Sequence, residues 1–188
     1  MKTLRLPLAL AALAGLGACA TTGEGLAPSA RDQSADAARE ARNVDRRARA
    51  RVASADMLTQ MAFWAGEYQT FPNDLEAVQR FADALRRGGR ADRAAQVAGE
   101  ALGRFPEDRD LLMTYGLAQI GASRPHEALQ PLALLAQADA QNWRARSALG
   151  AALDQLGRYP EARRAYEEAL ALAPENPGVL TNMGVSHI

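Results

Sequence analysis

Residues 143–176 read WRARSALGAALDQLGRYPEARRAYEEALALAPEN, and this 34-residue stretch decides the fold because its pattern recurs along the chain. When the count restarts at Leu75, Arg109 and Pro177, like residues fall into register without a gap. Self-similarity at a fixed period of this length indicates a repeat array, in which each unit buries its apolar face against the next. Two positions of the count hold only small residues, namely Ala82, Gly116, Gly150 and Gly184 at the eighth and Ala94, Ala128 and Ala162 at the twentieth.

The spacing of small, large and helix-ending residues has a physical cause in a stack of helical hairpins. Positions 8 and 20 must be small where the two helices of one hairpin approach most closely, and larger residues at positions 7 and 24 fill the volume between neighbouring hairpins. A proline at position 32, as at Pro106 and Pro174, ends the second helix and turns the chain into the next unit. Residues that favour the N-cap precede each following helix, and these are Asp108, Asn142 and Asn176.

These positions resemble the signature of the tetratricopeptide repeat, and residues 143–176 match it most fully. The resemblance implies an all-α solenoid of helical hairpins, with complete repeats at 75–108, 109–142 and 143–176 and the first helix of a truncated fourth repeat at 177–188. Because the chain stops inside that fourth unit, we expect it to be a fragment of a longer protein. Pro131 lies inside the second helix of the middle repeat, where we expect it to kink that helix.

An amphipathic stretch precedes the first complete repeat. Methionine and aromatic residues recur at helical spacing over residues 57–68, which predicts a stripe that faces the core. Gln60 and Glu67, however, stand where the repeat pattern expects small residues. We therefore predict that residues 54–74 form a degenerate half-repeat, a helix that caps the N-terminal end of the stack.

Residues 1–18 have the form of a signal peptide, with basic residues, a short apolar run and small residues before Cys19. The apolar run is too short to cross a bilayer as a mature helix. The segment resembles the lipobox of bacterial lipoproteins, which implies cleavage before Cys19 and attachment of lipid to its thiol. The residue after the cysteine is Ala20 and not aspartate. By the sorting rule of such lipoproteins, the resemblance therefore implies the periplasmic face of the outer membrane. The alternative is an ordinary signal peptide with a coincidental cysteine.

Residues 19–53 are predicted to be the lipid anchor and an Ala/Arg-rich, flexible tether. Six arginines crowd residues 39–51 of this segment. One interpretation is attraction to anionic lipid headgroups, where each charge near the surface is worth about 1 kcal/mol. The other, which we favour, is a solvated and partly helical spacer whose charge is partly neutralised by its acidic residues.

Composition argues against several functional classes. The formal net charge is zero and no basic surface stands out, so we do not expect nucleic acid as a partner. One cysteine excludes an intrachain disulfide and a multi-cysteine metal site. His126 and His187 stand apart from any nucleophile or acidic partner, and there is no phosphate-binding glycine loop. We therefore expect a protein that is not an enzyme and that holds neither a cofactor nor a metal.

The surface that remains is the inner face of the first helix of each repeat. Positions 2, 5, 9 and 12 line the concave face of such solenoids. Here these positions are mainly apolar in the middle repeat and charged in the repeats on either side, which suits an extended or helical peptide with a few apolar anchors. The alternative is that a fourth repeat or the N-terminal helix folds over this strip. The predicted partner-binding residues are Glu76, Gln79, Asp83 and Arg86, then Asp110, Met113, Leu117 and Ile120, then Arg144, Ser147, Ala151 and Asp154.

Several stretches of the chain also resemble the TadD family, the lipoproteins of tight-adherence (Flp) pilus assembly. They are NDLEA at 73–77, ALRRGGR at 84–90, LDQLGR at 153–158 and LTNMGVS at 180–186. The resemblance implies a pilotin-like scaffold that binds the secretin, or another pilus component, at the outer membrane. The alternative is a general envelope lipoprotein that aids the assembly of outer-membrane proteins or peptidoglycan complexes.

Overall fold

The computed structural model describes residues 45–185, so the signal peptide, Cys19, most of the tether and His187 lie outside the described residues. The chain divides into two units, Met1–Asp45 and Arg46–Ile188, and all that follows concerns the second. Within residues 45–185 the regular structure is entirely helical, which confirms the predicted all-α fold. After a helical segment at 46–52, the helices are α2 (Met57–Thr70), α3 (Leu75–Arg87), α4 (Ala91–Leu102), α5 (Arg109–Gly121), α6 (Pro125–Ala138), α7 (Trp143–Gln155), α8 (Tyr159–Leu172) and α9 (Pro177–Val185).

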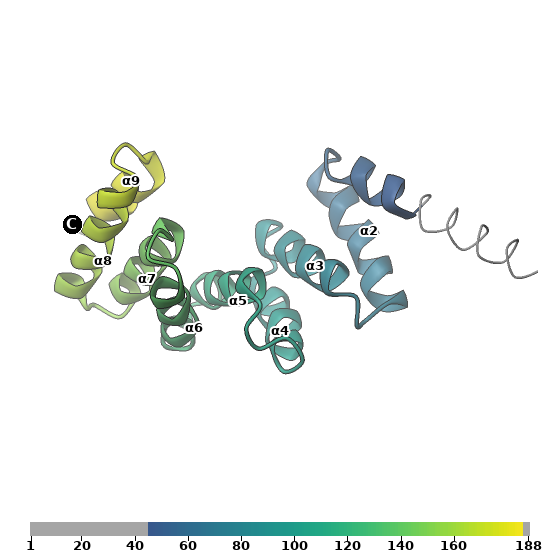
Figure 1. Cartoon of the computed structure of the whole chain (residues 1–188), viewed down its shortest axis with the longest axis horizontal. Coiled ribbons are helices and arrows are strands. Elements are labelled where there is room, and N and C mark those ends of the chain that lie inside the picture. Colours follow the sequence, from purple (N-terminus) through teal and green to yellow (C-terminus); the bar gives the residue numbers. More distant parts are fainter. Residues whose placement is uncertain (1–44, 186–188) are drawn as a thin grey trace, which may run out of the picture. The chain divides into compact units, whose positions relative to one another are not determined.

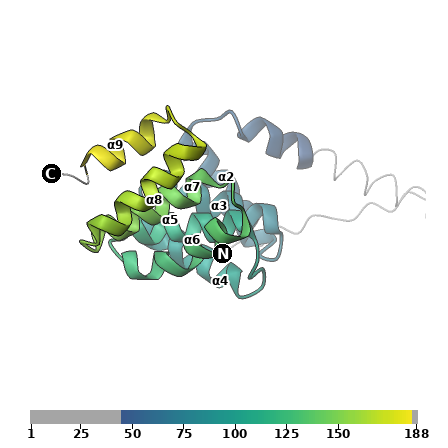
Figure 2. The ribbon, with the colours of Figure 1, turned by 60° about the vertical axis from the view of Figure 1, so that its left-hand side comes forward.

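The helices pair into hairpins that stack in chain order. α3 packs on α4, α5 on α6 and α7 on α8, while each first helix also contacts the first helix of the next hairpin. Figure 1 shows the ribbon passing from α2 to α9 without returning on itself, and Figure 2 shows the same ribbon turned by 60°. The arrangement is a solenoid in which each hairpin touches only its neighbours. None of the described helices is long and apolar enough to cross a membrane.

Each first helix begins at a side chain that satisfies its free backbone N–H groups. Asp74, Asp108 and Asn142 accept hydrogen bonds from the backbone N–H three residues later, at 3.0, 2.9 and 3.0 Å. Inside the hairpins, the fifteenth position has a left-handed backbone, which is glycine at Gly89 and Gly157. The second hairpin has Ser123 at that position, with φ 58°, a conformation that a residue with a Cβ adopts at some cost.

The small residue at position 8 faces the side chain at position 24 of the same hairpin. A Cβ added at Gly116 would lie 2.7 Å from Leu132, and one added at Gly150 would lie 2.6 Å from the ring of Tyr166. Leu132 also packs in one core cluster with Ala145 of α7, and Tyr166 packs in one with Val179 of α9. These side chains therefore fill space within their own hairpin in addition to the predicted space between hairpins. The first hairpin combines two fully buried alanines at the same positions, Ala82 and Ala98.

The proline in the middle repeat does not interrupt its helix. α6 runs continuously from Pro125 to Ala138 with Pro131 inside it. Pro131 and its neighbour Leu132 are both buried. The ring therefore serves as part of the core, and the missing backbone N–H costs one hydrogen bond without ending the helix.

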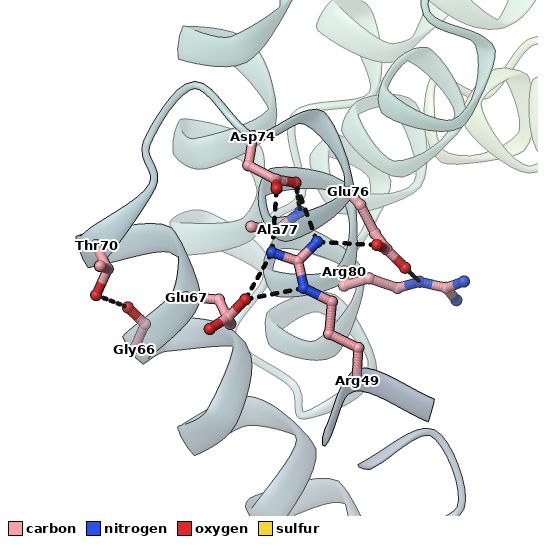
Figure 3. Close-up of polar contacts among 8 residues, drawn as sticks. All are labelled: Arg49, Gly66, Glu67, Thr70, Asp74, Glu76, Ala77 and Arg80. Atoms are coloured by element: carbon pink, nitrogen blue, oxygen red, sulfur yellow. Dashed lines mark hydrogen bonds and ion pairs between the residues drawn. The ribbon is translucent and has the colours of Figure 1, made fainter. Parts of the chain in front are cut away.

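The N-terminal end of the stack requires a correction to the predicted tether of residues 19–53. Residues 46–52 belong to the folded unit, and Val52 is buried. Arg49 reaches across α2 and the start of α3, with its guanidinium 2.6 Å from Glu67, 3.0 Å from Asp74 and 3.0 Å from Glu76 (Figure 3). The side chain of Arg49 is only 13% exposed, so neither lipid headgroups nor bulk solvent are its surroundings.

The cap predicted at residues 54–74 is therefore one helix of a pair. α2 buries Trp64, and the Arg49 guanidinium carbon lies 5.7 Å from the centre of that ring. Burial lowers the pKa of Arg49, but hydrogen bonds to Asp74, Glu76 and Glu67 outweigh it and raise the pKa above its usual value. Arginine thus stays charged in this position and offsets part of the negative charge of the three carboxylates.

Candidate protein-binding groove

The first helices of successive repeats enclose a groove of about 680 Å³. This volume is typical of sites that hold several residues of a peptide or a small ligand. α5 forms the middle of the groove, α3 and α7 form its two sides, and α9 contributes one residue. The lining consists of Gln79, Arg80, Asp83, Arg86, Asp110, Met113, Thr114, Leu117, Ile120, Trp143, Arg144, Ser147, Ala148, Ala151 and Asn182.

The structure brings most of the residues predicted from the sequence into this groove. Two of them lie elsewhere, because their side chains are used within the fold. Glu76 accepts a hydrogen bond of 3.0 Å from Arg49, and Asp154 accepts one of 2.8 Å from the hydroxyl of Tyr166. Those that line it are Gln79, Asp83, Arg86, Asp110, Met113, Leu117, Ile120, Arg144, Ser147 and Ala151. That they bind a partner stays a prediction.

One repeat position that lines the groove was not predicted from the sequence. Position 6 contributes a residue from each first helix, namely Arg80, Thr114, Ala148 and Asn182. Position 6 could have been predicted from the sequence, because it lies beside position 5 and about one turn before position 9 on the same face of the helix. Trp143, at position 1, lines the groove as well.

The floor of the groove is apolar. Met113, Leu117 and Ile120 follow one another at i, i+4 and i+7 along α5, so they form one stripe. All three are half-buried and pack against the core cluster that contains Leu132 and Leu135. After Trp143 and Arg144 in its first turn, α7 lines the groove with the small residues Ser147, Ala148 and Ala151, so this part of the groove lies between a large apolar stripe and short side chains.

Most charges along the groove are already compensated. Asp83 accepts a bond of 2.7 Å from Arg86 and lies 3.7 Å from Arg87. Asp110 lies in the first turn of α5, where the helix dipole favours a negative charge. At the other side of the groove, Arg144 is exposed and its guanidinium carbon lies 5.3 Å from the centre of the Trp143 ring.

The described residues offer no grouping of histidine, cysteine, aspartate and glutamate that could hold a metal ion. His126, the second residue of α6, is exposed. Burial raises the pKa of Tyr166 above its usual value, helped by its hydrogen bond to Asp154, and that side chain lies in the core of the third hairpin. The raised pKa of Tyr166 therefore reflects the packing of the hairpin.

Comparison with known proteins identifies the repeat. Residues 143–176 match the family model described as tetratricopeptide repeat, over the same range as the predicted third repeat. Residues 143–176 therefore contain a tetratricopeptide repeat. Tetratricopeptide solenoids present extended concave surfaces to their partners, so the groove lies where this fold binds other proteins.

A curated relative shares part of this chain. The protein is the TPR repeat-containing protein PA4667 of Pseudomonas aeruginosa, which is 32% identical over 104 residues. The match covers 55% of this chain but only 18% of that protein, so this chain spans less than a fifth of its length.

Solved structures share the tetratricopeptide fold. MamA from Desulfovibrio magneticus, residues 41 to the end, aligns with a TM-score of 0.65 at 22% identity, covering 78% of this chain and 81% of that one. A mutant form of MamA aligns with a TM-score of 0.64 at 23% identity, covering 79% and 87%. The TPR domain of Arabidopsis OM64 aligns with a TM-score of 0.55 at 23% identity, covering 60% and 95%. At these identities the likeness concerns the fold alone.

Proposed function

We propose that this tetratricopeptide-repeat chain is a scaffold of the bacterial envelope, which holds a protein partner in the groove of α3, α5 and α7. The observation that carries the proposal is the stripe of Met113, Leu117 and Ile120, which remains half-exposed in a groove of about 680 Å³. An apolar stripe of this kind, with polar side chains around it, is typical of grooves that bind a peptide or a helix.

The partner we propose is a component of a tight-adherence (Flp) pilus machine, in the first place the outer-membrane secretin. The support is the TadD-like sequence at residues 73–90 and 153–186, together with the lipobox that ends at Cys19. In this proposal the lipid on Cys19 places the protein on the periplasmic face of the outer membrane, where a pilotin-like factor would meet the secretin.

A pull-down tests the partner. The full chain carrying Leu117→Glu is expected to lose capture of the secretin of the same bacterium, because a buried carboxylate on the groove floor carries a desolvation cost. Leu134→Glu is the matched control, since Leu134 lies on α6, is 49% exposed and does not line the groove. Thermal melting of both variants separates lost binding from lost folding. Secretin capture that survives Leu117→Glu would remove the groove from the proposal.

Membrane attachment is tested separately. Cys19→Ser is expected to abolish incorporation of a labelled fatty acid and to remove the protein from the outer-membrane fraction, because in this proposal the lipid on Cys19 attaches it there. A chain that stays in the outer membrane without label would contradict lipidation at Cys19.

The general envelope lipoprotein is the alternative, with the same fold and another client. Crosslinking in the native envelope distinguishes the two. If the alternative holds, residues of the groove will crosslink to an outer-membrane assembly factor or to a peptidoglycan enzyme. In that outcome the pilus role falls and the scaffold role stands.

A further inference from the structure

We infer that the groove selects a peptide segment in which one large apolar side chain is flanked by carboxylates. The inference rests on the proposed scaffold function and adds the chemistry of the partner. Two independent features of the groove support it, the shape of its middle and the charges left at its sides.

The shape calls for one large apolar side chain. On α7, Ser147, Ala148 and Ala151 leave space opposite the stripe of α5, since none of them reaches across the groove. Leu117 lies at the middle of that stripe and is only half-buried. A leucine, methionine or phenylalanine of a partner would fill this space and remove apolar surface of both partners from water, which favours binding.

The charges call for carboxylates beside that anchor. Among residues 45–185 no carboxylate forms an ion pair with Arg144, and the ring of Trp143 keeps its guanidinium at the groove. Across the groove, Arg80 is 62% exposed and its nearest carboxylate, on Glu76, lies 3.9 Å away. Glu76 is itself bound more closely by Arg49, at 3.0 Å.

The acidic residues of the groove do not cancel these cations. Asp83 is bound by Arg86 and flanked by Arg87, and Asp110 is stabilised by the N-terminus of its own helix. Arg80 and Arg144 therefore remain as two cationic positions on opposite sides of one apolar hollow. Arginine in such a position favours planar, bidentate contact with a carboxylate.

Selection from a random 12-residue peptide library on the purified full chain, with its fold verified by circular dichroism, tests the inference. Enrichment of peptides with a large apolar residue between Asp or Glu residues supports it. Enrichment of basic or uncharged peptides that Leu117→Glu abolishes would overturn the inference and leave the peptide-binding function standing. Peptides that bind equally well to the Leu117→Glu variant would overturn both.

Reversing the charge of Arg144 tests its role in the inference directly. Arg144→Glu is expected to weaken a selected acidic peptide about tenfold and to improve a version with Lys in place of each acid. The matched control is Arg93→Glu on α4, an exposed arginine that contacts only Gln96 in the described structure. Equal effects of the two reversals would show a response to net charge alone and would overturn the role of Arg144.

Filling the hollow tests its shape. Ala151→Leu is expected to weaken binding of the peptide at least fivefold, while Ala171→Leu on the exposed face of α8 leaves its affinity unchanged.

Sedimentation of the unliganded protein tests whether a second copy of the chain occupies the groove. A wild-type dimer that Leu117→Glu converts to a monomer would show that a second copy occupies the groove, and would overturn the inference.

Discussion

Two regions of the described chain are closed by different forces. At the N-terminal end, Arg49 fixes residues 46–52 to α2 and α3 through three carboxylates. In the third hairpin, the ring of Tyr166 fills the space that Gly150 leaves open, and its hydroxyl donates to Asp154 at 2.8 Å. The first contact depends on charge and the second on shape.

The difference has consequences for how each region opens. Ion pairs among partly exposed groups lose strength when a carboxylate is protonated or when salt screens the charges. A close steric fit responds to neither, but it tolerates almost no added volume. The N-terminal segment should therefore open locally under mild change, whereas the third hairpin should yield only to a change of its packing.

Gly150→Ala should have the largest effect. The new methyl group would lie 2.6 to 2.9 Å from three ring atoms of Tyr166, so overpacking outweighs the better helix propensity of alanine, for a net loss of about 2 kcal/mol. Urea denaturation measures it. Gly66→Ala in α2 is the control, because no atom lies within 4 Å of the added Cβ, and that variant should be as stable as the wild type or slightly more so. If the two substitutions behave alike, shape does not hold the third hairpin.

The double variant Gly150→Ala, Tyr166→Ala sharpens the same point. It recreates the pair of alanines that the first hairpin has at Ala82 and Ala98. The cost of Gly150→Ala should disappear in the Tyr166→Ala background, since neighbouring residues are not additive.

Arg49→Met should come next, at about 1–2 kcal/mol. The substitution leaves Glu67, Asp74 and Glu76 together without their cation, although Asp74 and Glu76 are exposed enough for water to compensate in part. Hydrogen exchange should rise in residues 46–70 and remain unchanged in residues 143–172. Arg51→Met, at an exposed position two residues away, should change neither region. Uniform loss of protection along the chain would contradict a local opening.

Tyr166→Phe should cost about 1 kcal/mol, the usual net contribution of one hydrogen bond. Because the folded state raises the pKa of Tyr166, its contribution is complete below the usual tyrosine pKa of about 10 and is lost as pH rises above it. Denaturation of the wild type between pH 9 and about 11 should show a loss that the Phe variant lacks. The same slope in both proteins would place the alkaline sensitivity elsewhere.

Acid should have the smallest effect on stability, below about 1 kcal/mol. It should act at the N-terminal end of the described residues. Burial raises the pKa of Asp74, but the hydrogen bond from the Ala77 N–H and the contact with Arg49 outweigh it, so the pKa lies below its usual value. Its contribution is therefore present above about pH 4 and is lost as pH falls through the lower, folded-state pKa. Hydrogen exchange of residues 46–70 should increase in that range for the wild type and less so for Asp74→Asn.

The sequence was sufficient for the hairpins because their restraints are local and repeated. Position 8 stays small in every count, and Asp108 and Asn142 cap the helices that follow them directly. The groove followed from the same register, since residues such as Met113 and Leu117 occupy positions whose direction the helix fixes.

The N-terminal segment could not be predicted in this way. Arg49 meets carboxylates that lie 18, 25 and 27 residues further along the chain, and no periodicity connects them. Its surroundings in sequence are rich in alanine and arginine, a composition that fits a solvated spacer equally well. Likewise, Tyr166 and Asp154 occupy known repeat positions, but the bond between them depends on the side chains chosen there and not on the repeat.

The nearest-neighbour pattern of contacts also bears on mechanics. Each helix from α2 to α9 touches only helices of its own hairpin and of the neighbouring hairpins. Tension applied along the stack would therefore be borne by successive junctions, each of which can yield and close again without rupture of a common core. We therefore expect the described helices to extend under load and to recover one junction at a time.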